Sequence, residues 1–227
     1  MHPIVQTLTL VAADDNGVCE SQALGAAGNL TLDGALVAAG VATLDSGGAA
    51  RRLIITSAGD DSTLTWLISG TIRDPGNPTN VIAATESLAG ANVGDAMSLK
   101  DWLTITAIHG SKAAAGAVTA GTNGWASAPA VPLDTFSPEF LASASGVVLS
   151  GDPTYQLEVT PDDIFGTWLQ PGQTVQWLVW SDLTAKHANA QTILSATNGP
   201  VPVRAARWTV TNGGSLRGTI LQQRSAA

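Results

Sequence analysis

The feature that most constrains the fold is a series of short segments in which apolar and polar residues alternate. Thr63–Thr71 reads TLTWLISGT, which places Leu64, Trp66 and Ile68 on one face of an extended chain. Thr154–Thr160 reads TYQLEVT and alternates in the same way. A period of two is what a half-buried antiparallel strand requires, because successive side chains point to opposite faces of a sheet.

Segments of this kind recur along the whole chain and are separated by Gly, Asn, Asp and Pro. A strand about every ten residues is the spacing of sandwiches and barrels. We therefore predict an all-β fold of two antiparallel β-sandwich or jelly-roll-like domains with little helix. The turn-forming composition of 121–132 places the domains at residues 1–122 and 123–227. Weak helical signals predict a single turn over 98–103 and a short helix over 182–190, with Ser181 or Asp182 as the N-cap of the helix.

The charge of the chain is low and acidic. Charged residues make up 12% of the 227 residues, and the net charge is −8. No patch of Lys and Arg would neutralise a run of phosphates, so direct binding to nucleic acid is not expected. So few charges give a monomer little protection against self-association, and contacts with other chains are expected. No stretch approaches the ~18 apolar residues of a membrane-spanning helix, and the first residues lack the pattern of a signal peptide.

Residues that bind metals are few and dispersed. Three acidic pairs are present, and calcium would require several such oxygens to converge. Turn chemistry explains them more simply, because Asp bonds its own backbone two residues on. The pairs are Asp14-Asp15, Asp60-Asp61 and Asp162-Asp163. The histidines (His2, His109 and His187) are far apart and there is one cysteine, Cys19, so neither a zinc site nor an internal disulfide is expected.

Motifs of catalysis are missing from the sequence. It contains no G-x-S-x-G nucleophile elbow, no P-loop lysine motif and no G-x-G-x-x-G before a helix. We predict that the protein is not an enzyme and needs no cofactor. A pair of carboxylates for glycoside hydrolysis stays open, because sequence does not reveal the distance between them.

The chain has seven tryptophans and one tyrosine. Core packing explains most of them, because Trp buries a large area and suits strands. In a strand predicted over 174–180, Trp177 shares a face with Val175 and Val179, whereas Trp180 points to the other face. Because Trp is enriched in interface cores, we predict Trp125, Trp168 and Trp180 as candidate interface residues. An aromatic platform for carbohydrate is the alternative.

Five segments together resemble a family of structural proteins of tailed bacteriophages. The stretch RRLIITSAGDDSTLTWLISGT is similar to a family segment in which I-T-S-A-G-N-D-S leads into a strand ending in G-T, with Asp60 in place of Asn. ESLAGANVG is similar to E-T-(I/V)-x-G-P-N-A-G, with Ala91 in place of Pro. The other three segments, in which Ala130 occupies a Trp position, are LTITAIHGSKAAAGAVTAGTNGWASAPAVPLD, YQLEVTPDDIF and VPVRAARWTVTNGGSLRGTILQQ.

The resemblance implies a location in the virion, assembled in the host bacterial cytoplasm. Combined with the low charge, it leads us to expect a capsid decoration or cement protein that clamps neighbouring capsomers. A collar, neck or tail component is the alternative, and a glycan- or receptor-binding module is the second alternative. The expected partners are the major capsid protein or neck and tail proteins, together with other copies of the chain in a trimer, pentamer or ring.

Overall fold

The computed structural model describes residues 4–45, 48–74, 77–133, 141–162, 164, 175–195 and 203–223. Within these residues the chain is all-β, every strand pairing is antiparallel and there is no α-helix. The predicted fold class is therefore confirmed, with sandwich-like packing of sheets. Where a helix was expected over 182–190, the structure has only the 3-10 turn η1 (Ser181–Leu183), which has Trp180 at its N-cap and no side-chain cap.

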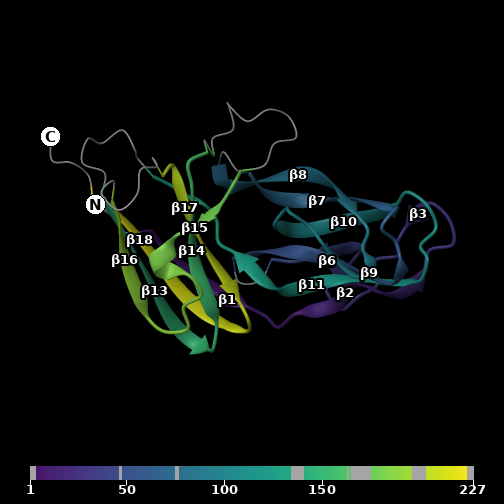
Figure 1. The fold of residues 1–227 in the computed structure, drawn as a ribbon, viewed down its shortest axis with the longest axis horizontal. Coiled ribbons are helices and arrows are strands. Elements are labelled where there is room, and N and C mark those ends of the chain that lie inside the picture. The colour runs from purple at the N-terminus through teal and green to yellow at the C-terminus, as the bar shows by residue number, and fades with distance from the viewer. Residues whose placement is uncertain are drawn as a thin grey trace.

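Strands pack around two separate apolar cores, which define two lobes (Figure 1). In the first lobe, one layer has the strand order β2-β11-β6-β9 and the other the order β8-β7-β10-β5-β4, with β3 also on β10. Their bounds are β2 Asp14–Ala23, β3 Gly28–Asn29, β4 Val37–Ala38, β5 Val41–Thr43, β6 Ala50–Asp60, β7 Thr65–Asp74, β8 Asn77–Ala89, β9 Asn92–Met97, β10 Trp102–Gly110 and β11 Ala117–Ser127. The inward residues Leu64, Trp66 and Ile68 are buried in this core, on the face that the alternation predicts.

The second lobe is a sandwich of a four-stranded sheet, β1-β18-β13-β16, against a layer that contains β15, β14, β17 and β12. Their bounds are β1 Ile4–Leu10, β12 Val131–Pro132, β13 Leu141–Gly151, β14 Thr154–Thr160, β15 Leu178–Val179, β16 Ala190–Ser195, β17 Ala205–Thr211 and β18 Gly214–Gln223. The strand predicted over 174–180 is shorter than expected. Only Leu178 and Val179 pair with β14, because the backbone N–H of Gln176 donates to Asp162 Oδ2 (2.7 Å) and not to a neighbouring strand.

The first and the last described strands pair in the second lobe. Strand β1 pairs with β18 from Ile4↔Ile220 to Leu10↔Gly214, and Leu8 and Leu10 join the core of this lobe. The expected boundary at residues 122/123 falls inside β11, which pairs with β6 of the first lobe and, at its end, with β17 of the second. The two lobes therefore do not coincide with residues 1–122 and 123–227. Strand β1 belongs to the second lobe, because its apolar side chains Leu8 and Leu10 are buried in the core that the C-terminal strands form.

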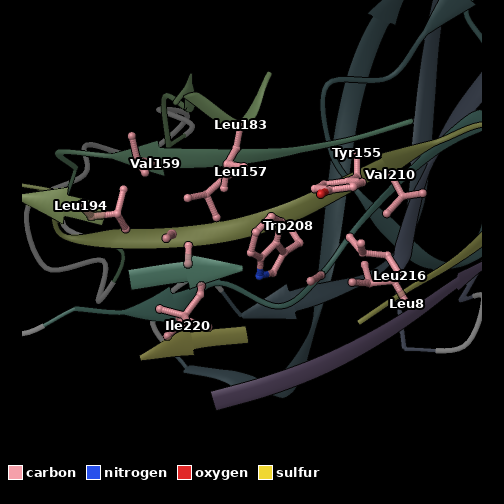
Figure 2. Packing of buried hydrophobic residues seen from close by; sticks show 14 of the residues in the cluster. Leu8, Tyr155, Leu157, Val159, Leu183, Leu194, Trp208, Val210, Leu216 and Ile220 are labelled. Atoms are coloured by element: carbon pink, nitrogen blue, oxygen red, sulfur yellow. The ribbon is translucent and has the colours of Figure 1, made fainter. Parts of the chain in front are cut away.

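Two glycines form a flat floor for the core of the second lobe. Gly146 and Gly218 are directly paired on β13 and β18. A Cβ added to Gly146 would lie 2.4 Å from Tyr155 Cε2, and one added to Gly218 would lie 2.3 Å from Trp208 Cδ1. The rings of Tyr155 and Trp208 meet edge to face with centroids 5.9 Å apart (Figure 2). The missing side chains therefore let both rings lie directly on the sheet backbone.

We expect Gly218→Ala to lower the free energy of unfolding by about 2 kcal/mol, because an added methyl group overpacks a site whose neighbour, Trp208, is fully buried. Denaturant titration followed by Trp fluorescence measures this loss. Gly25→Ala is the matched control, since nothing lies within 4 Å of its added Cβ. Equal stability of the two variants would contradict the role of the glycine floor.

Candidate functional site

A cluster of charged side chains joins the two lobes, with the Arg207 guanidinium at its centre. Arg207 on β17 donates through Nε and Nη2 to Glu158 Oε2 on β14, at 2.8 and 2.7 Å. Its Nη1 donates to Asp101 Oδ2 at 2.7 Å, and Asp101 lies just before β10 in the first lobe. Because all three side chains are largely buried, their charges are poorly screened and depend on one another.

Aromatic rings cover the guanidinium groups of this cluster. The Trp177 ring centroid lies 4.3 Å from Arg207 Cζ, and the Trp125 centroid lies 5.5 Å from it. Arg52 Cζ lies 4.2 Å from the Trp125 centroid, and Arg52 Nε donates to Asp101 Oδ1 at 3.4 Å. Such contacts stabilise a cation that has lost part of its water. The rings of Trp125 and Trp177 thus stabilise the two guanidinium groups at the junction between the lobes, where water is partly excluded.

The neighbouring Arg51 anchors the junction from the other side of β6. Its Nη2 donates to the backbone oxygens of Asn123 (2.6 Å) and Ala12 (3.4 Å), so it ties β11 and the β1–β2 connection to β6. Burial lowers the pKa of Arg51, and the nearby Asp14 partly offsets this. The one adjacent basic pair of the sequence therefore serves two internal contacts instead of forming a basic patch.

A cavity of about 460 Å³ lies beside the ion cluster and is lined by residues of both lobes, including Arg73, Leu99, Pro129 and Ile164. Three carboxylates line it: Asp74, Asp101 and Glu158, of which the last two accept hydrogen bonds from Arg207. The geometry is that of a structural joint, and the expected lack of enzyme activity stays a prediction.

The outer face of the four-stranded sheet is the second candidate surface. Along these strands side chains alternate between the core and the exterior. The outward set combines small polar side chains with exposed apolar ones, and it includes Val5, Ser143, Ser145, Gln191, Ile193, Thr219 and Leu221. Ile193 and Leu221 are 53% and 37% exposed, and Val5 is 53% exposed. Between Ile193 and Leu221, over Ser143 and Ser145, the surface is hollowed by about 710 Å³, and Asp182 of η1 also lines this hollow.

This face carries almost no charge. Strands β1, β13, β16 and β18 contain one charged residue, Arg217, although the chain as a whole has 18 acidic and 10 basic residues. The net charge of −8 is therefore carried elsewhere. Sequence analysis did not single out this surface, although the runs IVQTLTL, LASASGVVLSG, AQTILS and GSLRGTILQQ already show the near-absence of charge.

The three tryptophans predicted at an interface lie in different surroundings. Trp125 is partly buried beneath Arg52 at the joint. Trp180 is partly buried and packs against the core of the second lobe. Trp168 lies outside the described residues. Nothing in the structure brings Trp125 and Trp180 into one exposed patch, and their part in an interface stays a prediction.

Asp60 makes the hydrogen bond expected of a turn, whereas Asp14 and Asp15, which were also expected in a turn, begin strand β2. Asp60 Oδ1 accepts the Ser62 N–H at 3.0 Å, and bonds from the Ser62 side chain and then its backbone lower the pKa of Asp60. Buried Asp61 accepts Ser57 Oγ (2.6 Å) and the Ala115 N–H (2.7 Å). The part of the chain that the structure describes holds no group of three His, Cys, Asp or Glu side chains suited to a metal ion. Asp163 and His2 lie outside that part.

The two described histidines, His109 and His187, contact different neighbours. His109 Nδ1 lies 2.9 Å from Asn29 Oδ1, across the β10–β3 pair. His187 Nδ1 lies 3.2 Å from Thr154 Oγ1 and 3.9 Å from Asp152 Oδ1. These contacts fasten neighbouring strands and loops, and they do not bring the two histidines together.

Comparison of the sequence with protein-family models and with curated proteins gives no match. Among the described residues, no helix has the length and apolar character needed to cross a bilayer. The features that bear on function are thus the ion cluster between the lobes and the uncharged face of the four-stranded sheet.

We expect Arg207→Met to lower the free energy of unfolding by about 3 kcal/mol, because it leaves the Glu158 carboxylate buried without its cation and leaves Asp101 paired with Arg52 alone among the described residues. Arg217→Met, at an exposed arginine of β18, is the control and should change stability by no more than about 0.5 kcal/mol. Denaturant titration of both variants measures the two changes in the free energy of unfolding. Equal, small effects would show that the cluster does not hold the lobes together.

We expect the Cys19 thiol to be unreactive in the folded protein. It is fully buried, and desolvation raises its pKa from 9.0 to about 11. The folded state therefore keeps the proton while the unfolded thiol ionises, so this group lowers stability as the pH rises from about 9 to 11. Titration with a thiol-reactive disulfide reagent at pH 8 should show reaction only after denaturant is added. Rapid reaction of the native protein would contradict this burial.

Proposed function

We propose that the protein is a non-enzymatic structural subunit of a tailed-phage virion, and specifically a capsid decoration protein that docks through the outer face of β1-β18-β13-β16. The observation that carries the proposal is the composition of that face, where Val5, Ile193 and Leu221 are exposed and the four strands contain one charged residue, Arg217, with Asp182 beside them in the lining of the hollow. The sequence resemblance to phage structural proteins suggests that the partner is another virion protein, such as the major capsid protein.

Such a face suits a large contact between proteins. Charged residues are depleted from interface cores, because each buried charge must be desolvated. Burial of apolar surface contributes about 25 cal/mol per Å², and a standard interface buries about 800 Å² on each partner. The small outward side chains Ser143, Ser145 and Thr219 let a partner approach closely and accept its hydrogen bonds. The acidic residues lie outside these four strands, and Asp182, which lines the hollow, accepts a hydrogen bond from the Thr192 hydroxyl at 2.9 Å.

The joint between the lobes supports a mechanical role. Arg207 links Glu158 of the second lobe to Asp101 of the first, and β11 hydrogen-bonds to strands of both. A clamp between capsomers must not bend at the junction of its two lobes. The continuous strand β11 and the buried ion cluster around Arg207 both oppose such bending. A subunit of this kind would transmit load from a docked second lobe to the first.

A collar, neck or tail protein would use the same docking face, but it would occur in fewer copies per virion than a decoration protein. Quantitative mass spectrometry of purified virions distinguishes the two, because a decoration protein occurs at every capsomer and a neck protein fills a single ring. A glycan platform receives no support from the described tryptophans. Trp66, Trp102 and Trp208 are buried, and arginines cover Trp125 and Trp177.

We expect an Ile193→Glu, Leu221→Glu double variant to bind expanded phage heads at least about tenfold more weakly than the unaltered protein, because two carboxylates must then be desolvated. Co-sedimentation of the protein with purified heads measures the binding. Val93→Glu on the first lobe, where Val93 is 63% exposed, is the control and should bind normally. Unchanged binding by the double variant, or failure of the unaltered protein to bind heads, would contradict the proposal.

A further inference from the structure

We propose that the cavity between the two lobes binds a small organic anion, a monocarboxylate with an apolar body. The inference goes beyond the proposed function and does not rest on it. Docking uses the outer face of the four-stranded sheet, whereas this cavity lies beside the Arg207 cluster. The kind of ligand follows from the size, the lining and the charge of the cavity.

The cavity has the size of a small-molecule site. Its volume of about 460 Å³ lies within the ~300–1,000 Å³ typical of such sites. The end of β7, the connection from β9 to β10 and the end of β11 contribute lining residues from the first lobe, whereas β14, β17 and residues 175–177 contribute them from the second. A ligand in the cavity would therefore contact both lobes.

Apolar side chains form part of the wall. They include Leu99, Pro129, Ile164 and Trp177. Leu99 is 72% exposed, which makes it the most exposed of the large apolar side chains among the described residues. Contact with the apolar body of a ligand would remove such surface from water, and this favours binding.

Two of the cations that line the cavity are already neutralised within the ion cluster. Asp101 Oδ2 accepts hydrogen bonds from Arg207 Nη1 and from Ser127 Oγ (2.9 Å), while its Oδ1 accepts one from Arg52 Nε. Glu158 Oε2 accepts two hydrogen bonds from Arg207. The two arginines and the two carboxylates thus balance one another, and neither carboxylate is available to a further cation.

The other two cations at the cavity, Arg73 and Lys100, form no ion pair within the described part of the chain. Arg73 Nη2 donates to the Gly48 backbone oxygen at 3.1 Å, and its Nε is buried without a hydrogen-bond partner among the described residues. A buried N–H group is costly to leave unbonded, and most such groups have a partner. The missing partner is a first indication of a ligand.

The balance of charge in the lining indicates that the ligand is an anion. The described residues that line the cavity include four cations and three carboxylates, the third carboxylate being Asp74. The lining therefore carries a net charge of +1, although the chain as a whole carries −8. A single negative charge on the ligand would neutralise this excess.

The backbone beside Lys100 is held in place before any ligand binds. The buried Glu86 carboxylate accepts the N–H groups of Leu99 (2.6 Å) and Lys100 (3.1 Å), and Ser98 Oγ donates to the Lys100 backbone oxygen at 3.0 Å. The backbone of Lys100, and not its ammonium group, makes these contacts. Binding would thus order one side chain on a fixed backbone, which keeps its entropic cost low.

A monocarboxylate with an apolar body matches these features better than other anions do. A guanidinium group such as that of Arg73 donates two parallel N–H bonds to one carboxylate. A phosphate dianion would leave one charge uncompensated in a partly dry cavity. A carboxylate without an apolar body, such as acetate, would leave the wall around Leu99 and Trp177 in water.

Calorimetric titration of the full chain with phenylbutyrate tests the site. We expect one saturable site per chain, with an affinity at least about tenfold higher than for phenylbutanol, which lacks the charge, because hydrogen bonds to charged groups are stronger than neutral ones. Acetate, which lacks the apolar body, should also bind at least about tenfold more weakly. Saturating phenylbutyrate should raise the melting temperature, because the ligand binds only the folded protein.

Variants at the lining locate the site. Lys100→Gln and Arg73→Gln should each weaken phenylbutyrate binding by at least about tenfold and leave phenylbutanol binding unchanged. Lys112→Gln is the matched control, because Lys112 is exposed and lies outside the lining, and it should bind normally. Ala130→Trp, at a partly exposed position of the lining, should fill the cavity and abolish binding of both compounds.

Three results would overturn the proposal: no saturable binding of phenylbutyrate, equal affinities for phenylbutyrate and phenylbutanol, or normal phenylbutyrate binding by both Lys100→Gln and Ala130→Trp. The Ala130→Trp arm does not depend on the charge variants, and circular dichroism verifies that each variant is folded. Binding to phage heads is measured separately by co-sedimentation, so failure of this proposal would leave the proposed function standing.

Discussion

The Arg207 guanidinium is the contact on which the arrangement of the two lobes depends. It bonds to Glu158 in its own lobe and to Asp101 in the other, and the rings of Trp177 and Trp125 cover it. Each lobe has its own apolar core, so neither core alone fixes the angle between them. A buried ion cluster does so because its members lose much of their stabilisation if they separate.

Charge is distributed so that the two lobes have different surfaces. The first lobe and the joint hold most of the acidic residues, whereas the four-stranded sheet of the second lobe has Arg217 alone. The glycine floor beneath Tyr155 and Trp208 keeps that sheet closely packed from within. The outer face, with one charged residue in its four strands, and the ion cluster between the lobes are the features on which the proposed docking role rests.

Local patterns in the sequence predicted the all-β class, because alternation in TLTWLISGT and TYQLEVT depends only on neighbouring residues. Long-range pairing was not predictable in this way. The pairing of β1 with β18 joins residues from opposite ends of the chain, and the Arg207–Asp101 contact spans 106 positions. Trp177 was assigned to a regular strand, but its ring stacks on Arg207 and its neighbour Gln176 bonds to Asp162. The uncharged sheet was visible in the sequence only once its four strands were known to be adjacent.

The most direct test of the account is a cryo-electron microscopy reconstruction of the virion at a resolution that traces this chain. We predict density for the chain at the capsomer surface, with the outer face of β1-β18-β13-β16 buried against another virion protein and Ile193 and Leu221 inside the contact. A virion in which this face is turned to solvent while another surface makes the contact would contradict the central claim.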